Sequence, residues 1–375
     1  MKIRAAVLDR SRQPQPYTES RPLRVETLEL DAPGPGEVLV KIAAAGLCHS
    51  DLSIINGDRP RPLPMALGHE AAGIVEEIGS GVVDLKRGDH VALAFVPSCG
   101  HCIPCMEGRP ALCEPAVAAA IAGTLLCGDR RLRRADAKPV NHQVGVSCFA
   151  EYAVVARGTL VKIDRDLPLD VAALFGCAVL TGVGAAINAG RLRLGASAAV
   201  VGLGGVGLSA LLGAQAAGAR HLVAIDTLDR KLELARALGA THAFRADDPD
   251  LVARVKEATG GGVDVAIEAA SAVAALNTAY QITRRGGITV TVSLPPPADT
   301  FNVPAVNLVV EERTLKGSYL GSAVPARDIP RFIALYRAGR LPIDRLVTHR
   351  LALDDINLGF DRLANGEAVR QVIVF

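Results

Sequence analysis

The sequence predicts an α/β protein in which a β-rich part is joined to a doubly wound parallel sheet with helices on both faces. The chain has 375 residues, and at roughly 100–200 residues per domain this length favours two or three domains. Short β-like runs between glycine and proline turns fill residues 33–161, whereas strand and helix patterns alternate from about residue 181 onward. These two sequence patterns predict two domains of different architecture.

The doubly wound sheet is predicted from the alternation in the second part. Apolar runs of strand length are followed by helical segments, which is typical of strands that crossover helices bury on both faces. The expected strands are 199–201, 222–225, 263–267 and 288–292, and the expected helices are 204–217, 229–238, 251–258 and 272–282. A last helix at 329–338 and a strand at 372–374 are too little to fold alone. We therefore expect them to complete one of the two larger units.

Composition and charge exclude several classes of protein. Hydrophobic residues make up 50% of the chain and charged residues 21%, which is typical of a globular protein. The net charge is only +2, so no bulk field favours nucleic acid or a membrane surface. No run approaches the ~18–20 uncharged apolar residues of a membrane span, and Met1–Arg4 leads into a charged segment rather than a signal-peptide core. We expect a soluble, cytoplasmic protein without nucleic-acid or membrane partners.

A glycine-rich motif predicts a dinucleotide site. The segment 202–207 reads Gly-Leu-Gly-Gly-Val-Gly, follows the strand at 199–201 and opens a helix. Gly202 permits a tight turn, Gly204 lets the backbone approach a pyrophosphate, and Gly207 permits close packing of helix on strand. Roughly 20 residues further on, the next strand ends in Asp226, whose carboxylate can accept hydrogen bonds from a ribose 2′-OH and would repel a 2′-phosphate. This arrangement predicts NAD rather than NADP.

Four of the eight cysteines lie close together and predict a closed metal site. They have the spacing C-x2-C-x2-C-x7-C within a loop rich in proline and glycine, at Cys99, Cys102, Cys105 and Cys113. Four thiolates suit tetrahedral Zn2+ in a structural site with no open position. An iron–sulfur cluster is the main rival, although in the bacterial ferredoxin run the fourth cysteine follows after three residues rather than seven. Disulfides between such near neighbours would be strained.

A second set of metal-binding residues is dispersed along the chain. Cys48 opens the run Cys-His-Ser-Asp, His69 lies in Gly-His-Glu, and Cys177 follows a glycine. Two thiolates and one imidazole make a ligand set that a catalytic Zn2+ can use while keeping a fourth position open. Spacing alone does not connect these residues, because each one is also explained as a buried thiol or a hydrogen-bonded histidine.

Over nearly its whole length, from about Ala5 to Phe375, the chain resembles the zinc-dependent medium-chain alcohol dehydrogenases of the dehydrogenase/reductase superfamily. The segment 68–73, Gly-His-Glu-Ala-Ala-Gly, together with Gly79 and Val82, is similar to the family's zinc signature. The four-cysteine spacing and the position of the nucleotide motif also resemble the family. The resemblance implies a GroES-like catalytic domain at 1–178 and 320–375, with the structural-zinc lobe at about 97–115, and a Rossmann NAD-binding domain at 179–319.

The resemblance also implies a role for each residue of the catalytic site. Cys48, His69 and Cys177 would hold a catalytic zinc, which makes two Zn2+ per chain. Glu70 would lie beside the metal or bind it transiently, and Asp51 would orient the His69 ring. Ser50 would take the alcohol proton. The implied cofactor contacts are His49, Thr181, Gly202, Gly204, Gly205, Val206, Gly207, Asp226, Lys231, Val292, Ser318 and Arg370.

The expected substrate is a medium or bulky primary alcohol, aryl or allylic alcohols included, or the corresponding aldehyde. Aromatic residues are only 3% of the chain and tryptophan is absent, so we expect a roomy, mainly apolar pocket with a polar spot. The pocket positions that the resemblance implies are Ser50, Phe95, Ala118, Gln143, Val144 and Leu320. Many relatives end the proton relay with a histidine three residues after the catalytic hydroxyl, where this chain has Ser53. The family also implies a homodimer or homotetramer paired through the nucleotide domain.

Three other functions stay open at the level of sequence. The run Cys-His-Ser-Asp at 48–51 also resembles the thiol (glutathione)-dependent formaldehyde dehydrogenases, although residues 52–67 do not. The four-cysteine loop is compatible with a nucleic-acid-binding zinc module whose basic face is the arginine cluster within 130–134, a cluster that a solvated hairpin face explains more simply. A non-catalytic protein that kept the fold is the third alternative.

Overall fold

The computed structural model describes residues 1–375 as two compact units. The first unit comprises Met1–Cys177, Val324–Pro330 and Asp344–Phe375, and the second comprises Ala178–Ala323 and Arg331–Ile343. The segment Arg331–Ile343, which we expected in the first domain, therefore groups with the second unit. One physical reason is that the Arg340 guanidinium donates a hydrogen bond of 2.8 Å to the carbonyl of Ala216.

The second unit contains a six-stranded parallel sheet in the order β13-β12-β11-β14-β15-β16. The strand order reverses between β11 and β14, so the carboxyl ends of these strands flank the crevice where doubly wound sheets bind nucleotides. The bounds are β11 Ser197–Val201, β12 His221–Asp226, β13 His242–Arg245, β14 Val263–Glu268, β15 Thr283–Thr291 and β16 Thr314–Gly317. The observed sheet confirms the predicted fold class.

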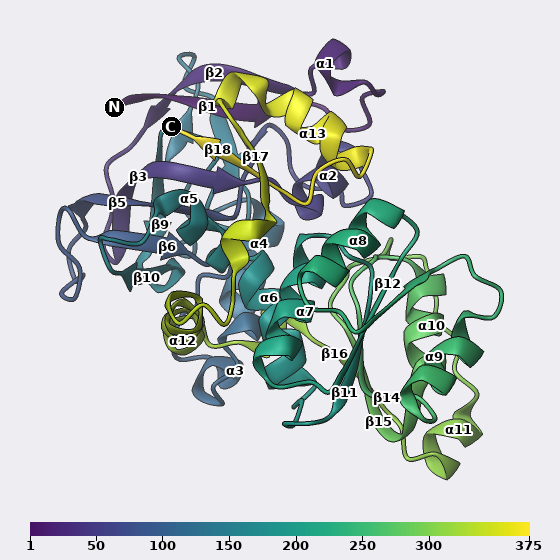
Figure 1. Cartoon of the computed structure of the whole chain (residues 1–375). Helices are drawn as coiled ribbons and strands as arrows, with labels where there is room; N and C mark the ends of the chain where they lie inside the picture. Colours follow the sequence, from purple (N-terminus) through teal and green to yellow (C-terminus); the bar gives the residue numbers. More distant parts are fainter. The chain divides into compact units, whose positions relative to one another are not determined.

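Helices cover both faces of this sheet, with α7 and α8 on one side and α9 and α10 on the other (Figure 1). The bounds are α6 Ala178–Gly184, α7 Gly205–Ala216, α8 Asp229–Ala237, α9 Leu251–Thr259, α10 Val273–Ile282 and α11 Ala305–Val310, and α12 runs from Pro325 to Arg337. The central strand β11 and most of α7 are buried, and their residues are mainly apolar. The edge strands β13 and β16 were not predicted, since neither has a buried residue in the unit and their sequences carry polar side chains.

The first unit is built from two β-structures. One is a closed barrel, β1-β2-β7-β8-β4, and the other is a seven-stranded sheet in the order β10-β6-β5-β3-β18-β17, in which β9 also pairs with β3. The bounds are β1 Lys2–Leu8, β2 Leu23–Leu30, β3 Glu37–Gly46, β4 Met65–Ala66, β5 Ala71–Ile78, β6 His90–Leu93, β7 Leu132–Arg133, β8 Pro139–His142, β9 Tyr152–Ala156, β10 Leu160–Ile163, β17 Val347–Leu351 and β18 Arg370–Val374.

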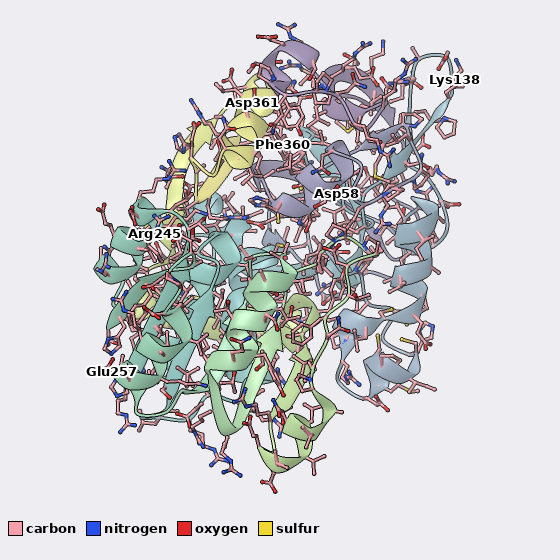
Figure 2. All side chains as sticks on the ribbon, turned by 90° about the vertical axis from the view of Figure 1, so that its right-hand side faces the viewer. Asp58, Lys138, Arg245, Glu257, Phe360 and Asp361 are labelled. Atoms are coloured by element: carbon pink, nitrogen blue, oxygen red, sulfur yellow. The ribbon has the colours of Figure 1, made fainter.

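The carboxyl-terminal segment completes the first unit, as expected from its short length. Strand β18 pairs antiparallel with β3, and Phe360 packs edge-to-face on Phe149 with ring centroids 6.1 Å apart. The neighbouring Asp361 carboxylate accepts hydrogen bonds from the backbone of Tyr17 and Thr18. Helix α13 therefore lies beside α1, and Figure 2 labels Phe360 and Asp361 on it. The helices of this unit are α1 Tyr17–Ser20, α2 His49–Ile55, α3 Ile103–Met106, α4 Glu114–Ala122, α5 Leu169–Ala172 and α13 Ile356–Ala364.

The arginines between 130 and 134 are partly buried, and three of them are paired with carboxylates. Arg131 donates to Glu37 at 2.9 Å, and Arg134 donates to Glu26 and Asp9, each at 2.8 Å. Arg133 pairs with Asp31, and Arg130 bonds to Asn141. The hairpin continues to Lys138 near the edge of the molecule (Figure 2). Carboxylates therefore neutralise the face that a nucleic acid would need.

No single helix in the structure is long and apolar enough to cross a membrane. Only the bent pair Leu169–Gly176 and Ala178–Ala189 meets the length and composition criteria together.

The buried His142 predicts a specific pH dependence of stability. Its Nε2 accepts a hydrogen bond from the Arg131 backbone, and burial, with Arg130 and Arg131 nearby, lowers its pKa to about 3. An unfolded histidine has a pKa of about 6.5. As the pH falls from about 6.5 towards 3, the unfolded chain therefore takes up a proton that the folded chain does not, and stability declines.

Between pH 6.5 and 5.5, the wild type should lose about 1 kcal/mol of its free energy of unfolding through protonation of His142 in the unfolded chain. We expect His142→Gln to lack this loss. Urea denaturation of both proteins at the two pH values measures the difference. Equal losses in the variant and the wild type would show that His142 does not titrate as described.

Candidate functional site

Three dispersed residues converge into one buried cluster in the first unit. The thiol sulfurs of Cys48 and Cys177 and a ring nitrogen of His69 all lie within 4.8 Å of one another. Cys48 caps the amino end of α2, His69 lies between β4 and β5, and Cys177 follows a short 3-10 turn at 173–176. Two thiols and an imidazole at this spacing fit the ligand set of a Zn2+ ion with one position left for another ligand.

The protonation of the cluster supports a cation. The hydrogen bond from Cys177 holds the pKa of the Cys48 thiol well below its ordinary value, and the same pairing raises the pKa of Cys177. These opposite directions favour a thiolate at Cys48 that accepts a hydrogen bond from the Cys177 thiol. A bound cation would displace the proton of that thiol, as metals do when they bind cysteine.

Asp51 orients two of the three cluster residues. Its Oδ1 lies 2.8 Å from His69 Nδ1, and its Oδ2 accepts the backbone N–H of Cys48 at 3.0 Å. Burial lowers the pKa of His69, but the Asp51 carboxylate outweighs burial and raises it. With Nδ1 directed at Asp51, Nε2 is the nitrogen left for a metal.

A buried ion pair lies next to the cluster in sequence and in space. The Arg370 guanidinium pairs with Oε1 of Glu70, and both side chains are almost fully buried. Burial raises the pKa of Glu70 despite the charge of Arg370. The second oxygen, Oε2, has no hydrogen-bond partner within the chain. A buried carboxylate oxygen without a partner is costly, and a cation at the cluster would offset that cost.

The four-cysteine loop forms a second cluster. The sulfurs of Cys99, Cys102, Cys105 and Cys113 lie within 4.8 Å of one another, and all are free thiols. Burial raises the pKa of Cys99, but the backbone N–H groups of His101 and Cys102 outweigh it and lower the value to about 7. Backbone donors to sulfur favour thiolates, which are the form that binds zinc. This donor set fits a closed structural zinc.

The glycine motif of the second unit has the predicted local geometry. Gly202 follows β11 directly and has φ +93°, and Gly204 precedes the first residue of α7. A side chain at Gly207 would collide with the carbonyl of Gly202. The amino end of α7 thus follows directly on the glycine turn, and a helix amino end is suited to binding an anion such as a pyrophosphate. Val206 is half-buried in the first turn of α7, and Gly205 begins it.

Asp226 lies at the carboxyl end of β12, beside this motif. Its carboxylate accepts the backbone N–H groups of Leu203 at 2.7 Å and Leu228 at 3.1 Å. Lys231 Nζ lies 3.7 Å from the same carboxylate. These bonds hold the carboxylate rigidly against the glycine loop.

Sequence reasoning missed Glu268, which ends β14. Its Oε1 accepts the backbone N–H groups of Ala270 and Ser271, and its Oε2 accepts the hydroxyls of Thr291 and Ser293, at 2.6–2.9 Å. An acidic residue at the end of a buried strand, as at Asp226, was the signal that would have found it. Glu268 fixes the ends of β14 and β15. The neighbouring cofactor candidates Val292 and Ser318 are half-buried and buried, and Ser318 donates its N–H to Thr291.

The remaining candidate residues have different surroundings. In the first unit, Phe95 packs edge-on against the His69 ring at 5.5 Å, Ser50 is half-buried, and His49 and Ala118 are exposed. In the second unit, Thr181 and Leu320 are buried.

Gln143 and Val144 form the start of a turn after β8. Val144 is half-buried with φ +44°. The Gln143 amide is engaged at both ends in a buried network with Gly68 and Asp51. Its place in the wall of a substrate pocket stays a prediction.

Comparisons with known proteins cover both units. Residues 34–165 match the alcohol dehydrogenase GroES-like domain family, and residues 205–338 match the zinc-binding dehydrogenase family. The putative alcohol dehydrogenase D of Mycobacterium tuberculosis is 42% identical over the full length of both chains. The NDMA-dependent alcohol dehydrogenase of Amycolatopsis methanolica is 39% identical over all of this chain and 99% of its own. The benzyl alcohol dehydrogenase of Acinetobacter calcoaceticus, a solved structure, has a TM-score of 0.92 at 34% identity and covers 100% of this chain and 99% of its own.

The four-cysteine cluster is predicted to stabilise the fold through its own zinc, separately from the cluster of Cys48, His69 and Cys177. We expect Cys102→Ser to lose about one zinc per chain and to lower the melting temperature by roughly 5–10 °C, because structural zinc contributes directly to folding. Metal analysis and thermal unfolding measure both effects. Cys127→Ser is the matched control, since Cys127 is free and lies outside both clusters. Unchanged zinc content and stability in Cys102→Ser would contradict a structural site.

Proposed function

The chain belongs to the zinc-dependent medium-chain alcohol dehydrogenases, and on that premise we propose that it transfers a hydride between NAD and a medium or bulky primary alcohol. The observation that carries the proposal is the buried convergence of Cys48, His69 and Cys177 with one coordination position to spare. Zinc held by these residues would supply Lewis-acid stabilisation that lets an alcohol lose its proton near neutral pH. We propose two zinc ions per chain, the second in the four-cysteine loop.

Ser50 is the proposed acceptor of the alcohol proton. It lies two residues after Cys48 in the first turn of α2 and is half-buried, next to the exposed His49. Ser53 does not continue a relay from this point, because its hydroxyl donates to the His49 carbonyl one turn back at 2.9 Å. The proton therefore passes from Ser50 to solvent at the start of α2.

The proposed NAD contacts combine the glycine motif and Asp226 with the positions that the family resemblance implies. Asp226 would accept the ribose hydroxyls, and the N–H groups after Gly204 would bind the pyrophosphate. Lys231 is a further proposed ribose contact, and His49 and Arg370 are proposed pyrophosphate contacts. Thr181, Val206, Val292 and Ser318 are the proposed nicotinamide residues.

The proposed class of alcohol rests on apolar residues at the candidate pocket positions. Phe95 packs on His69 and Val144 is half-buried after β8, while the Gln143 amide is held in its own hydrogen bonds. Apolar residues at these positions favour apolar substrates over ethanol. The similarity to a benzyl alcohol dehydrogenase supports aryl alcohols in particular.

A substrate panel with NAD+ tests the proposal. We expect kcat/KM to rise at least about tenfold from ethanol to benzyl alcohol and geraniol, since each buried CH2 contributes ~0.8 kcal/mol. Cys48→Ala should abolish turnover and lose one zinc while keeping its circular dichroism. A parallel series with NDMA tests whether an added acceptor is needed, and a series with glutathione tests the formaldehyde alternative. Turnover that falls from ethanol to the bulky alcohols would contradict the substrate proposal.

Asp226 predicts the choice of nucleotide. We expect Asp226→Gly to lower the ratio of kcat/KM with NAD to kcat/KM with NADP by roughly 10–100-fold. The reason is that hydrogen bonds to a charged group contribute about 1.5–3 kcal/mol. Asp247→Gly is the control, since Asp247 is an exposed acid paired with Arg245 in the same unit. An unchanged ratio in Asp226→Gly would contradict the ribose role.

We propose a homodimer or homotetramer that pairs through the second unit. Its helix α11 exposes Val306, Val309 and Val310, and the edge strand β16 exposes Leu315. An open strand edge next to an apolar helix is suited to extending the sheet into a second copy. Light scattering should give at least twice the 39.1 kDa chain mass. A monomeric mass at micromolar concentration would contradict this proposal.

A further inference from the structure

The Gln143 side chain joins two parts of the first unit through a single amide group. It is 3% exposed. Its Oε1 accepts the backbone N–H of Gly68 at 2.5 Å, and its Nε2 donates to Asp51 Oδ1 at 2.7 Å. Nε2 also lies 3.4 Å from His69 Nδ1. The amide therefore contacts the residue that precedes His69 and the carboxylate that orients the His69 ring.

The chemistry of these two partners specifies an amide. Gly68 offers a donor and Asp51 offers an acceptor, so the side chain between them needs both an acceptor and a donor at its tip. A carboxylate would repel Asp51, and an apolar side chain would leave a buried N–H without a partner. With Gln143, the Asp51 carboxylate accepts from His69, Gln143 and the Cys48 backbone. Each bond reduces the rotation left to the carboxylate.

The turn that carries Gln143 is held in an uncommon conformation. Val144 and Ser147 have φ values of +44° and +53°, which are unfavourable for residues with side chains. The Ser147 hydroxyl accepts the Gln143 N–H at 2.9 Å and donates to the Ala66 carbonyl at 2.7 Å. The turn is thus bonded to the segment that leads into Gly68 and His69. Left-handed residues persist where surrounding contacts hold them, and such sites are concentrated near functional groups.

The position of Gly68 does not accommodate a residue with a side chain. Its φ is +99°, and a side chain there would collide with the backbone of Phe149 and with Cys148. The Gly68 N–H, which donates to Gln143 Oε1, is therefore fixed in direction one residue before His69.

We propose that Gln143 is a positioning residue of the Cys48–His69–Cys177 site: its amide fixes Asp51 and the backbone before His69, and so sets the direction of the imidazole. The inference rests on the proposed function, in that zinc binds these three residues. Gln143 is not one of the three clustered ligands, and in this role it acts through Asp51 and Gly68.

Zinc release tests the proposal without using turnover. The probe is the metal itself, followed with a colorimetric chelator in the full chain. We expect Gln143→Met, which keeps the side-chain length and removes both hydrogen bonds, to release the cluster zinc about 10–100-fold faster than the wild type. The Co2+-substituted variant should also show shifted visible absorption bands, because these bands report ligand geometry. Cys48→Ala, which lacks this zinc, identifies the fraction being released.

Gln371→Met is the matched control. Gln371 is equally buried in the same unit, and its Nε2 donates to the Gly359 carbonyl at 2.6 Å. We expect it to lose stability with unchanged zinc release and unchanged cobalt bands. If Gln143→Met does not fold, Gln143→Glu serves instead, since it keeps the acceptor for Gly68 and removes the donor to Asp51, and it should also release zinc faster.

Two results would overturn the inference, and one would overturn its premise. Wild-type release rates and cobalt bands in Gln143→Met or Gln143→Glu would show that Gln143 does not position the site. Equally fast release in Gln371→Met would show that losing any buried amide of this unit has the same effect. A wild type whose zinc content equals that of Cys48→Ala would instead refute the proposed zinc at this cluster.

Discussion

The burial of the Asp51 carboxylate is the constraint on which the site in the first unit depends. The side chain is fully buried, and an isolated charge in such a place would cost several kcal/mol. Three hydrogen bonds offset that cost, and their donors are the Cys48 backbone, the His69 ring and the Gln143 amide. Satisfying one carboxylate thus places two proposed metal ligands and one supporting side chain. The same bonds select the tautomer of His69.

Both units place their polar groups at the ends of strands and at glycine turns, while the strands themselves supply rigidity. In the first unit, His69 follows Gly68 at the end of β4. In the second unit, Asp226 and Glu268 end β12 and β14, the two strands that flank β11, and accept backbone N–H groups from nearby loops. Buried carboxylates therefore fix the loop geometry in both units. The NAD-binding crevice that we propose lies at the carboxyl ends of a parallel sheet, where such folds bind nucleotides.

Sequence patterns predicted the local features and missed those that depend on distant contacts. The glycine motif, the four-cysteine loop and most strands of the second unit were found because their signals are contiguous. Cys48, His69 and Cys177 were connected only through a family resemblance, since their spacing says nothing about convergence.

The role of Gln143 was not predicted for the same reason. Its partners Gly68 and Asp51 lie 75 and 92 residues away, and the turn that aims the amide has left-handed residues that no pattern indicates. Edge strands β13 and β16 were missed because their side chains are not buried in the unit.

Anomalous X-ray scattering at the zinc absorption edge, from crystals of the purified protein, tests the central claim most directly. We predict two peaks per chain, one inside the four-cysteine loop and one between Cys48, Cys177 and Nε2 of His69, with Asp51 on the Nδ1 side of the ring. A single peak in the four-cysteine loop, in a protein that still oxidises alcohols, would contradict the zinc site described above.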